Sequence, residues 1–434
     1  MTTLSEEIKM ADGRAAVRII LLVGCFCLSS AIFSSNDNQE RKISIVEFLC
    51  ESPSYPDCRG KHYSIIHVVA ESLDKRSAIH YLWSVIYSPT IVMAYFEKTG
   101  VNVTVDWKKV LTNGNLTDGI SFTEYSEYIT ALVIPAIYEF QDPKDALFYT
   151  DWKKVKADTI VKHPFHKLNW EKPVIDRENN ITTFKASMLG GEVTFQCNAS
   201  FHQERESVLP RQQSSSNSTV LTLTLNNLTK LNKTRGNTRF IFELYSLTAQ
   251  QSESTTCVKA EKYIDDEFTP AVFKTIIVNS TGTGGTAYSA WKPVAYIDKK
   301  RSLEEQVPSY AYYRNSHHFI SSHCDSLPYS PYHPSSFSIA YHLEKYTFLS
   351  YGMNISFGRQ KDGWYDGKEA KRYLSWSAVV GYGRPLSDHF SPVVLIIIIV
   401  GFGAPLLLIF VTVVYIIVKR FKAKKAASSY GIIN

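Results

Sequence analysis

The stretch from residue 62 to residue 96 reads HYSIIHVVAESLDKRSAIHYLWSVIYSPTIVMAYF, and it decides which kind of fold the chain has. Its runs His62–Ala70, Ala78–Tyr87 and Thr90–Phe96 are dense in β-branched and aromatic residues. Residues that favour turns separate the runs. Because such side chains suit the pleated surface of a sheet, the sequence predicts three consecutive β-strands.

A helix is expected after these strands, over residues 143–163. Asp142 is the expected N-cap and Pro143 the first helical residue, while Pro164 ends the pattern. Between them, apolar residues recur at helical spacing from Phe148 to Val155. The predicted helix is long enough to cross a whole sheet.

The same order of elements is expected a second time. Strand-like runs occur at Thr182–Met188, Glu192–Cys197 and Val220–Leu225, and a long helical stretch is predicted from Phe240 to Lys274. Strands followed by a helix, twice over, favour an antiparallel sheet with its helices gathered on one face.

A third segment, residues 291–386, has shorter strand candidates. They lie at Phe319–His323, Phe337–Leu343, Met353–Phe357 and Tyr373–Val380, and turns rich in Pro, Ser and Gly separate them. This texture is typical of a β-sandwich.

The two ends of the chain predict its topology. Val393–Val418 contains no charged side chain, which predicts a transmembrane helix, and the basic cluster within residues 419–425 predicts a cytosolic tail. Ile19–Leu28 is a shorter apolar run behind Arg14 and Arg18, and we interpret it as a cleaved signal peptide. An uncleaved signal anchor is the alternative.

Asn-X-Ser/Thr sequons and cysteines place the bulk of the chain outside the cytosol. All nine sequons precede the predicted span, and a set of this size on one side of it indicates N-glycosylation. Cys25 and Cys27 lie in the signal segment, and Cys50 and Cys58 are close enough to form a local disulfide loop. The sequons are Asn102, Asn115, Asn180, Asn198, Asn217, Asn227, Asn232, Asn279 and Asn354.

Charge and motifs argue against several classes of function. The net charge of +6 includes five positive charges in the tail, so nothing indicates nucleic acid binding. Gly282–Gly285 lacks the residues of a phosphate loop, and the histidines within His317–His323 lack the paired spacing of a zinc site. We therefore expect no enzyme, no metal and no cofactor.

Three local motifs resemble the MHC class I heavy-chain superfamily. Gly191–Cys197 resembles a strand of the second half of the class I platform, and Thr256–Val258 resembles the platform helix that carries its disulfide cysteine. Trp364–Val380 resembles the D to E region of an immunoglobulin constant-type domain. The resemblance implies a disulfide between Cys197 and Cys257 and leaves Cys324 as the odd cysteine. It also implies an α+β fold, with a class I-like platform, a truncated immunoglobulin-like β-sandwich next to the membrane and one transmembrane helix.

This interpretation divides the chain into eight segments. They are a signal peptide (1–33), an N-terminal extension (34–60), two platform halves (61–168 and 169–280), a linker (281–290), the immunoglobulin-like segment (291–386), the transmembrane helix (393–418) and the cytoplasmic tail (419–434).

The function that the resemblance implies is immune evasion, because the arrangement is similar to that of roseolovirus class I-like membrane glycoproteins. The expected partner is a host immune surface protein: a class I molecule, a class I-like stress ligand or an immune receptor. A ligand-presenting class I-like molecule and a virion attachment or adhesion glycoprotein are the alternatives.

The tail carries one further motif. Tyr430 and Ile433 have the spacing of a tyrosine-based sorting signal, which clathrin adaptors capture as an extended peptide. We therefore expect a single-pass type I membrane protein that moves from the endoplasmic reticulum to the cell surface, with routing to endosomes and lysosomes.

Overall fold

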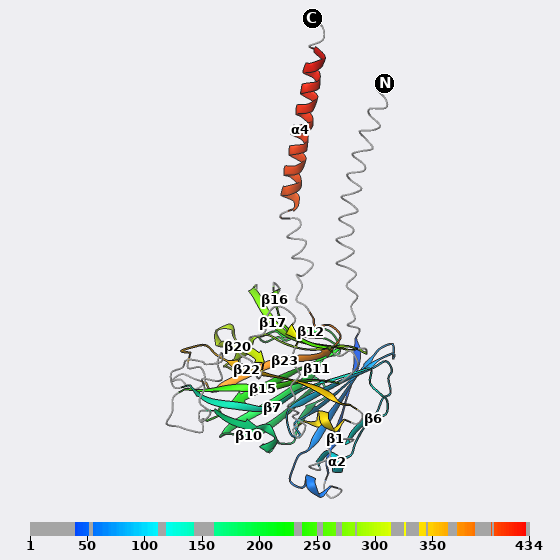
Figure 1. Ribbon diagram of the computed structural model, residues 1–434, viewed down its shortest axis with the longest axis vertical. Coiled ribbons are helices and arrows are strands. Elements are labelled where there is room, and N and C mark those ends of the chain that lie inside the picture. Colours follow the sequence, from blue (N-terminus) through cyan, green and yellow to red (C-terminus); the bar gives the residue numbers. More distant parts are fainter. Residues whose placement is uncertain are drawn as a thin grey trace.

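The architecture is known from a computed structural model, which describes most of the chain between residues 40 and 430. The described residues are 40–51, 55–111, 119–142, 160–229, 237–249, 255–265, 271–282, 284–313, 325–326, 338–343, 346–362, 371–386, 401 and 403–430. Residues 40–386 build a body made almost entirely of antiparallel strands, which we call the β body, and helix α4 extends away from it (Figure 1).

One layer of the β body contains the strands that the opening stretch predicts. β2, β3 and β4 pair in sequence order, which confirms these three strands, and β4 continues the layer through β7. Beyond β7 the order is β15, β22 and β20, and β8 also pairs with β7. The bounds are β1 (Arg41–Leu49), β2 (Ser64–Ser72), β3 (Ala78–Ser84), β4 (Thr90–Phe96), β7 (Tyr128–Asp142), β8 (Ile160–Pro164), β15 (Asn237–Ala249), β20 (Gln306–Tyr313) and β22 (Phe348–Phe357).

The second layer runs in the order β9, β10, β11, β14, β23, β18, β17, β16 and β21. β19 joins the two layers, because it pairs with β20 on one side and with β23 on the other. The bounds are β9 (Val174–Asp176), β10 (Ile181–Met188), β11 (Gly191–Ala199), β14 (Ser218–Asn226), β16 (Thr255–Asp265), β17 (Ala271–Gly282), β18 (Gly285–Trp291), β19 (Val294–Tyr296), β21 (Asp325–Ser326) and β23 (Tyr373–Tyr382).

Short elements cover the edges and loops of these layers. Two small hairpins, β5 with β6 and β12 with β13, stand apart from the main network. The bounds of the short elements are β5 (Val103–Val105), α2 (Trp107–Leu111), β6 (Ile120–Phe122), β12 (Glu204–Arg205), β13 (Gln213–Ser214) and the 3₁₀ helices η1 (Pro56–Cys58), η4 (Phe165–Lys167), η5 (Leu303–Glu305) and η7 (Ile339–His342). The long helix α4 spans Ala404–Tyr430.

The predicted helix from Phe240 to Lys274 is wrong, because β15, β16 and the start of β17 occupy it. β15 explains the error. Phe242 packs in the core between the layers, whereas Tyr245 packs in a second core on the opposite face. A strand that is buried on both faces has a continuous apolar sequence, and periodicity alone does not distinguish such a run from a helix. Of the other predicted helix, residues 143–159 lie outside the described residues, and its end forms β8.

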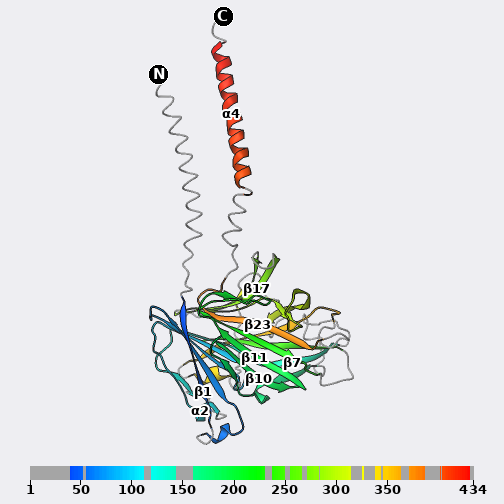
Figure 2. The same ribbon diagram turned by 180° about the vertical axis from the view of Figure 1, so that it is seen from behind.

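The expected α+β class I-like platform is also contradicted, since the described residues form a mostly antiparallel sheet structure. Seen from the opposite side in Figure 2, the β body again consists mainly of strands. In the expected sandwich segment, residues 339–342 form the 3₁₀ helix η7 instead of a strand, while Met353–Phe357 and Tyr373–Val380 lie within β22 and β23. β23 pairs with β14, so the pairing crosses the segment boundaries that the sequence suggested.

The structure also contradicts the expected transmembrane helix at 393–418. Within the part of the chain that the structure describes, no helix combines the length and the apolar character that a membrane crossing requires. Residues 393–400 and 402 lie outside that part, and α4 includes residues 404–418 of the predicted span.

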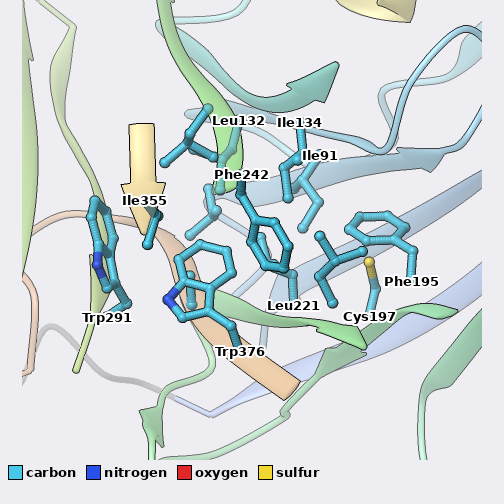
Figure 3. Close-up of a cluster of buried hydrophobic side chains, with 14 of the residues drawn as sticks. Ile91, Leu132, Ile134, Phe195, Cys197, Leu221, Phe242, Trp291, Ile355 and Trp376 are labelled. Atoms are coloured by element: carbon cyan, nitrogen blue, oxygen red, sulfur yellow. The ribbon is translucent and has the colours of Figure 1, made fainter. Parts of the chain in front are cut away.

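Three large side chains dominate the core between the layers. Trp376 of β23 lies edge-on to Trp291 of β18 and to Phe242 of β15, with ring centroids 5.8 and 6.0 Å apart. All three are buried, and Figure 3 shows them beside Leu132 and Ile355. Residues from the middle and the end of the chain therefore share one packed cluster.

We predict that Trp376→Ala lowers the free energy of unfolding by about 3–5 kcal/mol, because it leaves a cavity at the centre of this cluster. Chemical denaturation followed by circular dichroism measures the change. Leu303→Ala is the control, since that side chain is 46% exposed. Equal midpoints for the two variants would contradict the assigned core.

Candidate functional site

A cavity of about 410 Å³ opens where three segments of the β body meet. Residues 61–63 lead into β2, residues 85–87 follow β3, and residues 165–170 contain η4 and the loop after it. Sites that hold small molecules are commonly concave and of this size. The cavity is therefore the first candidate for a functional site.

Basic side chains line the cavity from two sides. Lys61 and His62 come from the segment before β2, and His166 and Lys167 come from η4. The described residues that form the lining include no aspartate or glutamate. The cavity therefore offers positive charge and hydrogen-bond donors without a carboxylate to compensate them.

A disulfide fixes the wall that carries Lys61. Cys50 and Cys58, the local pair expected from the sequence, are joined by a disulfide. The Lys61 backbone N–H donates to the carbonyl of Cys58 over 3.1 Å, and the Cys50 N–H donates to that of Tyr63 over 2.9 Å. The Lys61 ammonium then reaches across to donate to Asn169 Oδ1. The covalent loop and this hydrogen bond fix the positions of the two walls relative to each other.

Aromatic rings form the floor of the cavity. Phe165 is buried and packs against Trp170, with ring centroids 6.1 Å apart. The Trp170 indole N–H is buried and has no hydrogen-bond partner among the described residues. The two rings give the cavity an apolar floor.

Tyr87 sits at the rim in a strained backbone conformation. Its φ is +66°, in the left-handed region that aromatic residues rarely adopt. Its hydroxyl donates to the carbonyl of Val110, and its ring stacks on His342 with centroids 5.6 Å apart. Burial raises the pKa of Tyr87 to about 12, so the phenol stays neutral. These contacts maintain the unusual backbone that shapes the rim.

Burial lowers the pKa of His166, and the nearby Lys167 and Lys162 lower it further. Burial also raises the pKa of Tyr63, with a smaller contribution from Asp57. The arrangement thus presents ammonium, imidazole, amide and indole donors around an apolar floor. Such a set can hold an anion, because it supplies charge and N–H groups to acceptor atoms.

A second hollow, of about 570 Å³, is less suited to a charged ligand. It contains Glu204, Glu206 and Arg301, and Arg301 lies 3.9 Å from the Glu206 carboxylate. Its charges therefore compensate one another within the protein.

Among the cysteines, the pair implied by the class I resemblance does not form. Cys197 is a buried free thiol within the described residues, next to Phe195 in Figure 3. Cys257 is disulfide-bonded, but not to Cys197. The physical reason is their placement: Cys197 points into the core from β11, whereas Cys257 belongs to β16 and lies opposite Ser326 of β21. Cys324 lies outside the described residues.

The expected glycosylation sites differ in their exposure. Asn102 and Asn227 are exposed, and Asn180, Asn198 and Asn279 are half-buried. Asn217 and Asn354 are each only 6% exposed, and Arg41 Nε donates to Asn217 Oδ1 over 2.6 Å. Asn115 and Asn232 lie outside the described residues.

The remaining predicted sites are only partly described. The backbone of α4 runs to Tyr430, while Ile433 and the histidines at 317, 318 and 323 lie outside the described residues. The described residues include no group of three or more metal-binding side chains.

Sequence reasoning missed the cavity because its walls are about a hundred positions apart. Lys61–Tyr63 and Phe165–Trp170 each combine basic and aromatic residues, which is the one signal the sequence contains. Only the pairing of β8 with β7 and of β7 with β4 brings η4 to the side of β3.

A buried histidine pair lies elsewhere in the first layer. His67 Nε2 and His80 Nδ1 are 2.8 Å apart, and both rings are buried among Phe48, Phe96 and Phe122. Burial lowers the pKa of His67 to about 4 and that of His80 to about 3, with the neighbouring His67 adding to the second shift. Both rings are therefore neutral in the folded protein near neutral pH.

Comparison with known proteins identifies relatives along most of the chain. A family model described as "Glycosylated lysosomal membrane protein" matches residues 64–423. Glycosylated lysosomal membrane protein B of Xenopus laevis is 27% identical over 403 residues, which cover 88% of this chain and 90% of the relative. The Danio rerio protein is 27% identical, with 88% and 89% covered, and the Homo sapiens protein is 26% identical, with 86% and 87% covered.

These matches contradict the class I-like, viral interpretation. Motifs at three short positions suggested it, whereas the family model covers a continuous stretch of the β body and α4. The matches also contradict the expected immune-evasion function and the expected host immune partner. The ligand-presenting and viral-attachment alternatives gain no support from the matches.

We predict that Asn217 and Asn354 carry no glycan in the mature protein, because a glycan on a buried amide could not be accommodated in this fold. Asn102 and Asn227, whose side chains reach solvent, should be occupied. Mass spectrometry of glycopeptides after enzymatic deglycosylation in H₂¹⁸O measures the occupancy of each site. A glycopeptide at Asn354 would contradict the position of β22 in the sheet.

Acid should weaken the fold through the histidine pair. In the unfolded chain an imidazole has a pKa near 6.5, so the unfolded state binds more protons than the folded state as the pH falls from about 6.5 towards 4. Stability is therefore present above this window and lost through it. Between pH 7.5 and pH 5 we expect a loss of roughly 2 kcal/mol for each buried imidazole.

Denaturant titrations of His67→Leu/His80→Leu and of the wild type, each at pH 7.5 and pH 5, test this prediction. The double variant should lose less stability on acidification than the wild type. His202→Leu is the control, because that side chain is 42% exposed. An unchanged pH dependence in the double variant would count against the burial of the pair.

Proposed function

Because the chain belongs to the glycosylated lysosomal membrane protein family, we propose that it is a resident glycoprotein of the lysosomal membrane whose β body binds a ligand in the lumen. The observation that carries this proposal is the match of one family model from residue 64 to residue 423. That range contains most of the β body, two of the three segments that line the cavity (85–87 and 165–170) and most of α4.

Single-pass type I topology is part of the proposal. N-glycans are added on the lumenal side, and the accessible sequons, such as Asn102 and Asn227, all belong to the β body. The basic cluster within residues 419–425 favours the cytosolic side. This arrangement leaves the cavity in the lumen and the last residues in the cytosol.

Binding suits the cavity better than catalysis does. Nucleophilic catalysis needs a side-chain nucleophile with a base within hydrogen-bond reach, and the described lining contains no serine, threonine, cysteine, aspartate or glutamate for that role. The described lining instead combines ammonium and N–H donors with neutral phenols and an apolar floor. We therefore propose a binding protein and not an enzyme.

Tyr430 and Ile433 are proposed as the lysosomal sorting signal. Such signals are recognised as extended peptides whose Tyr and bulky apolar side chains enter separate pockets. Since the α4 backbone is helical up to Tyr430, recognition requires the last helical turn to open. Helix ends fray readily, so this opening costs little.

We predict that Tyr430→Ala and Ile433→Ala move the protein from lysosomes to the cell surface by several-fold, because each removes one side chain of the signal. Surface biotinylation and antibody uptake on the full-length protein measure the shift. Ile432→Ala is the matched control, since it removes the same side chain from a position of the motif at which any residue is accepted.

The control variant should remain lysosomal. Wild-type protein that is absent from lysosomes would overturn the proposed residence. Lysosomal delivery that persists in both motif variants would leave the residence intact and assign the signal to another part of the chain.

A further inference from the structure

We propose that the cavity between residues 61–63, 85–87 and 165–170 binds a small organic anion with a planar or apolar body, and that it binds this anion more tightly in acid. This inference rests on the proposed function, because it takes the cavity to face the lysosomal lumen. It adds the chemical class of the ligand and the condition under which the ligand binds.

Charge is the first argument for an anion. Lys61 on one wall and Lys167 on the other place two ammonium groups around the cavity, and the described lining contains no carboxylate. Like charges that face the same space repel one another, and an anion between them relieves that repulsion. A neutral or cationic ligand would not relieve the repulsion between the two ammonium groups.

Unused hydrogen-bonding capacity is the second argument. The Lys61 ammonium has three donors, of which one reaches Asn169 Oδ1. The ligand must therefore bring acceptor atoms, which carboxylate, sulfonate and phosphate groups supply in the charged form.

The floor and the volume define the rest of the ligand. The half-buried Trp170 presents ring surface, the fully buried Phe165 packs behind it, and the buried Val85 and Ile86 lie at the adjoining wall. A cavity of about 410 Å³ holds a molecule of one or two rings and is too small for a folded chain. A ligand with an anionic group joined to such a body would contact both the basic walls and the apolar floor of the cavity.

One imidazole connects the site to pH. His166 lies on the wall that η4 forms, and histidine is the side chain whose charge ordinarily changes between pH 5 and pH 8. The other titratable groups around it are Lys61, His62 and Lys167 in the lining, Lys162 on β8, and Asp57, which acts on Tyr63 from η1. Acidification therefore adds positive charge to a site that is already cationic.

Binding and protonation should reinforce each other at His166. Burial and two neighbouring lysines lower the pKa of this imidazole in the empty site. A bound anion opposes all three effects, because it favours the charged imidazolium. By linkage, the anion binds more tightly where the imidazole is protonated and takes up a proton when it binds.

The test uses full-length glycosylated protein in detergent with benzenesulfonate as the probe. Its sulfonate stays ionised throughout the range from pH 5 to pH 7.5, so any pH dependence belongs to the protein. Benzenesulfonamide has the same ring without the charge and serves as the matched neutral probe. Isothermal titration calorimetry and saturation-transfer NMR measure the dissociation constants.

At pH 5 we expect benzenesulfonate to bind about tenfold more tightly than benzenesulfonamide, and about tenfold more tightly than at pH 7.5. Lys61→Gln/Lys167→Gln should weaken sulfonate binding by about tenfold or more and leave the sulfonamide unaffected. Lys172→Gln is the control, because that lysine follows the same loop without lining the cavity.

Equal binding of the two probes at pH 5, or no binding of either to folded wild-type protein, would overturn the proposal. Sulfonate binding that does not change with pH would overturn its acid dependence. Thermal unfolding of every variant checks that it is folded, and the wild-type comparison decides the matter even if the double variant is not. Because localisation in cells is measured separately, failure here would leave the proposed lysosomal residence standing.

Discussion

The pairing of β23 with β14 is the constraint on which the rest of the structure depends. Nine residue pairs join Ser218–Asn226 to the last strand of the chain, and Thr222 Oγ1 lies 2.8 Å from Ser377 Oγ within that ladder. β23 also carries Trp376 into the core and pairs with β18 and with β19, and β19 links the two layers through β20. Because the ladder closes a loop of about 150 residues, its formation must offset a large entropic cost, and the central aromatic cluster supplies the burial that does so.

Contacts between segments that are far apart in the sequence also shape the cavity. β7 runs through the middle of the first layer and holds β4 on one part of its length and β8 on another, so η4 arrives beside the turn after β3. The Cys50–Cys58 disulfide then fixes the wall that Lys61 extends from. A rigid sheet with a covalently fixed rim can hold four basic side chains close together, which a flexible loop would separate.

The sequence predicts the fold well where strands are short and bounded by turns, as in His62–Phe96, and poorly elsewhere. Phe240–Lys274 was predicted to be helical because β15 is buried on both faces, so its apolar residues show no alternation. The class I resemblance arose because Gly191–Cys197 has the side chains of any buried strand, and such local similarity contains no information about the strand's partners. The cavity required the register of β7 and β8, which no local pattern contains. The local Cys50–Cys58 pair was predictable because both its ends lie in one short loop.

Disulfide trapping tests the central claim, the β14–β23 ladder, most directly. In a Cys197→Ala background, Thr222→Cys/Ser377→Cys places two thiols on facing positions of the ladder. We expect them to form a disulfide within one chain under mild oxidation, detected by non-reducing peptide mapping. Thr194→Cys/Ser377→Cys is the mismatched control, because β14 lies between those two strands. Trapping in the control pair but not in the matched pair would contradict this register and, with it, the closed β body.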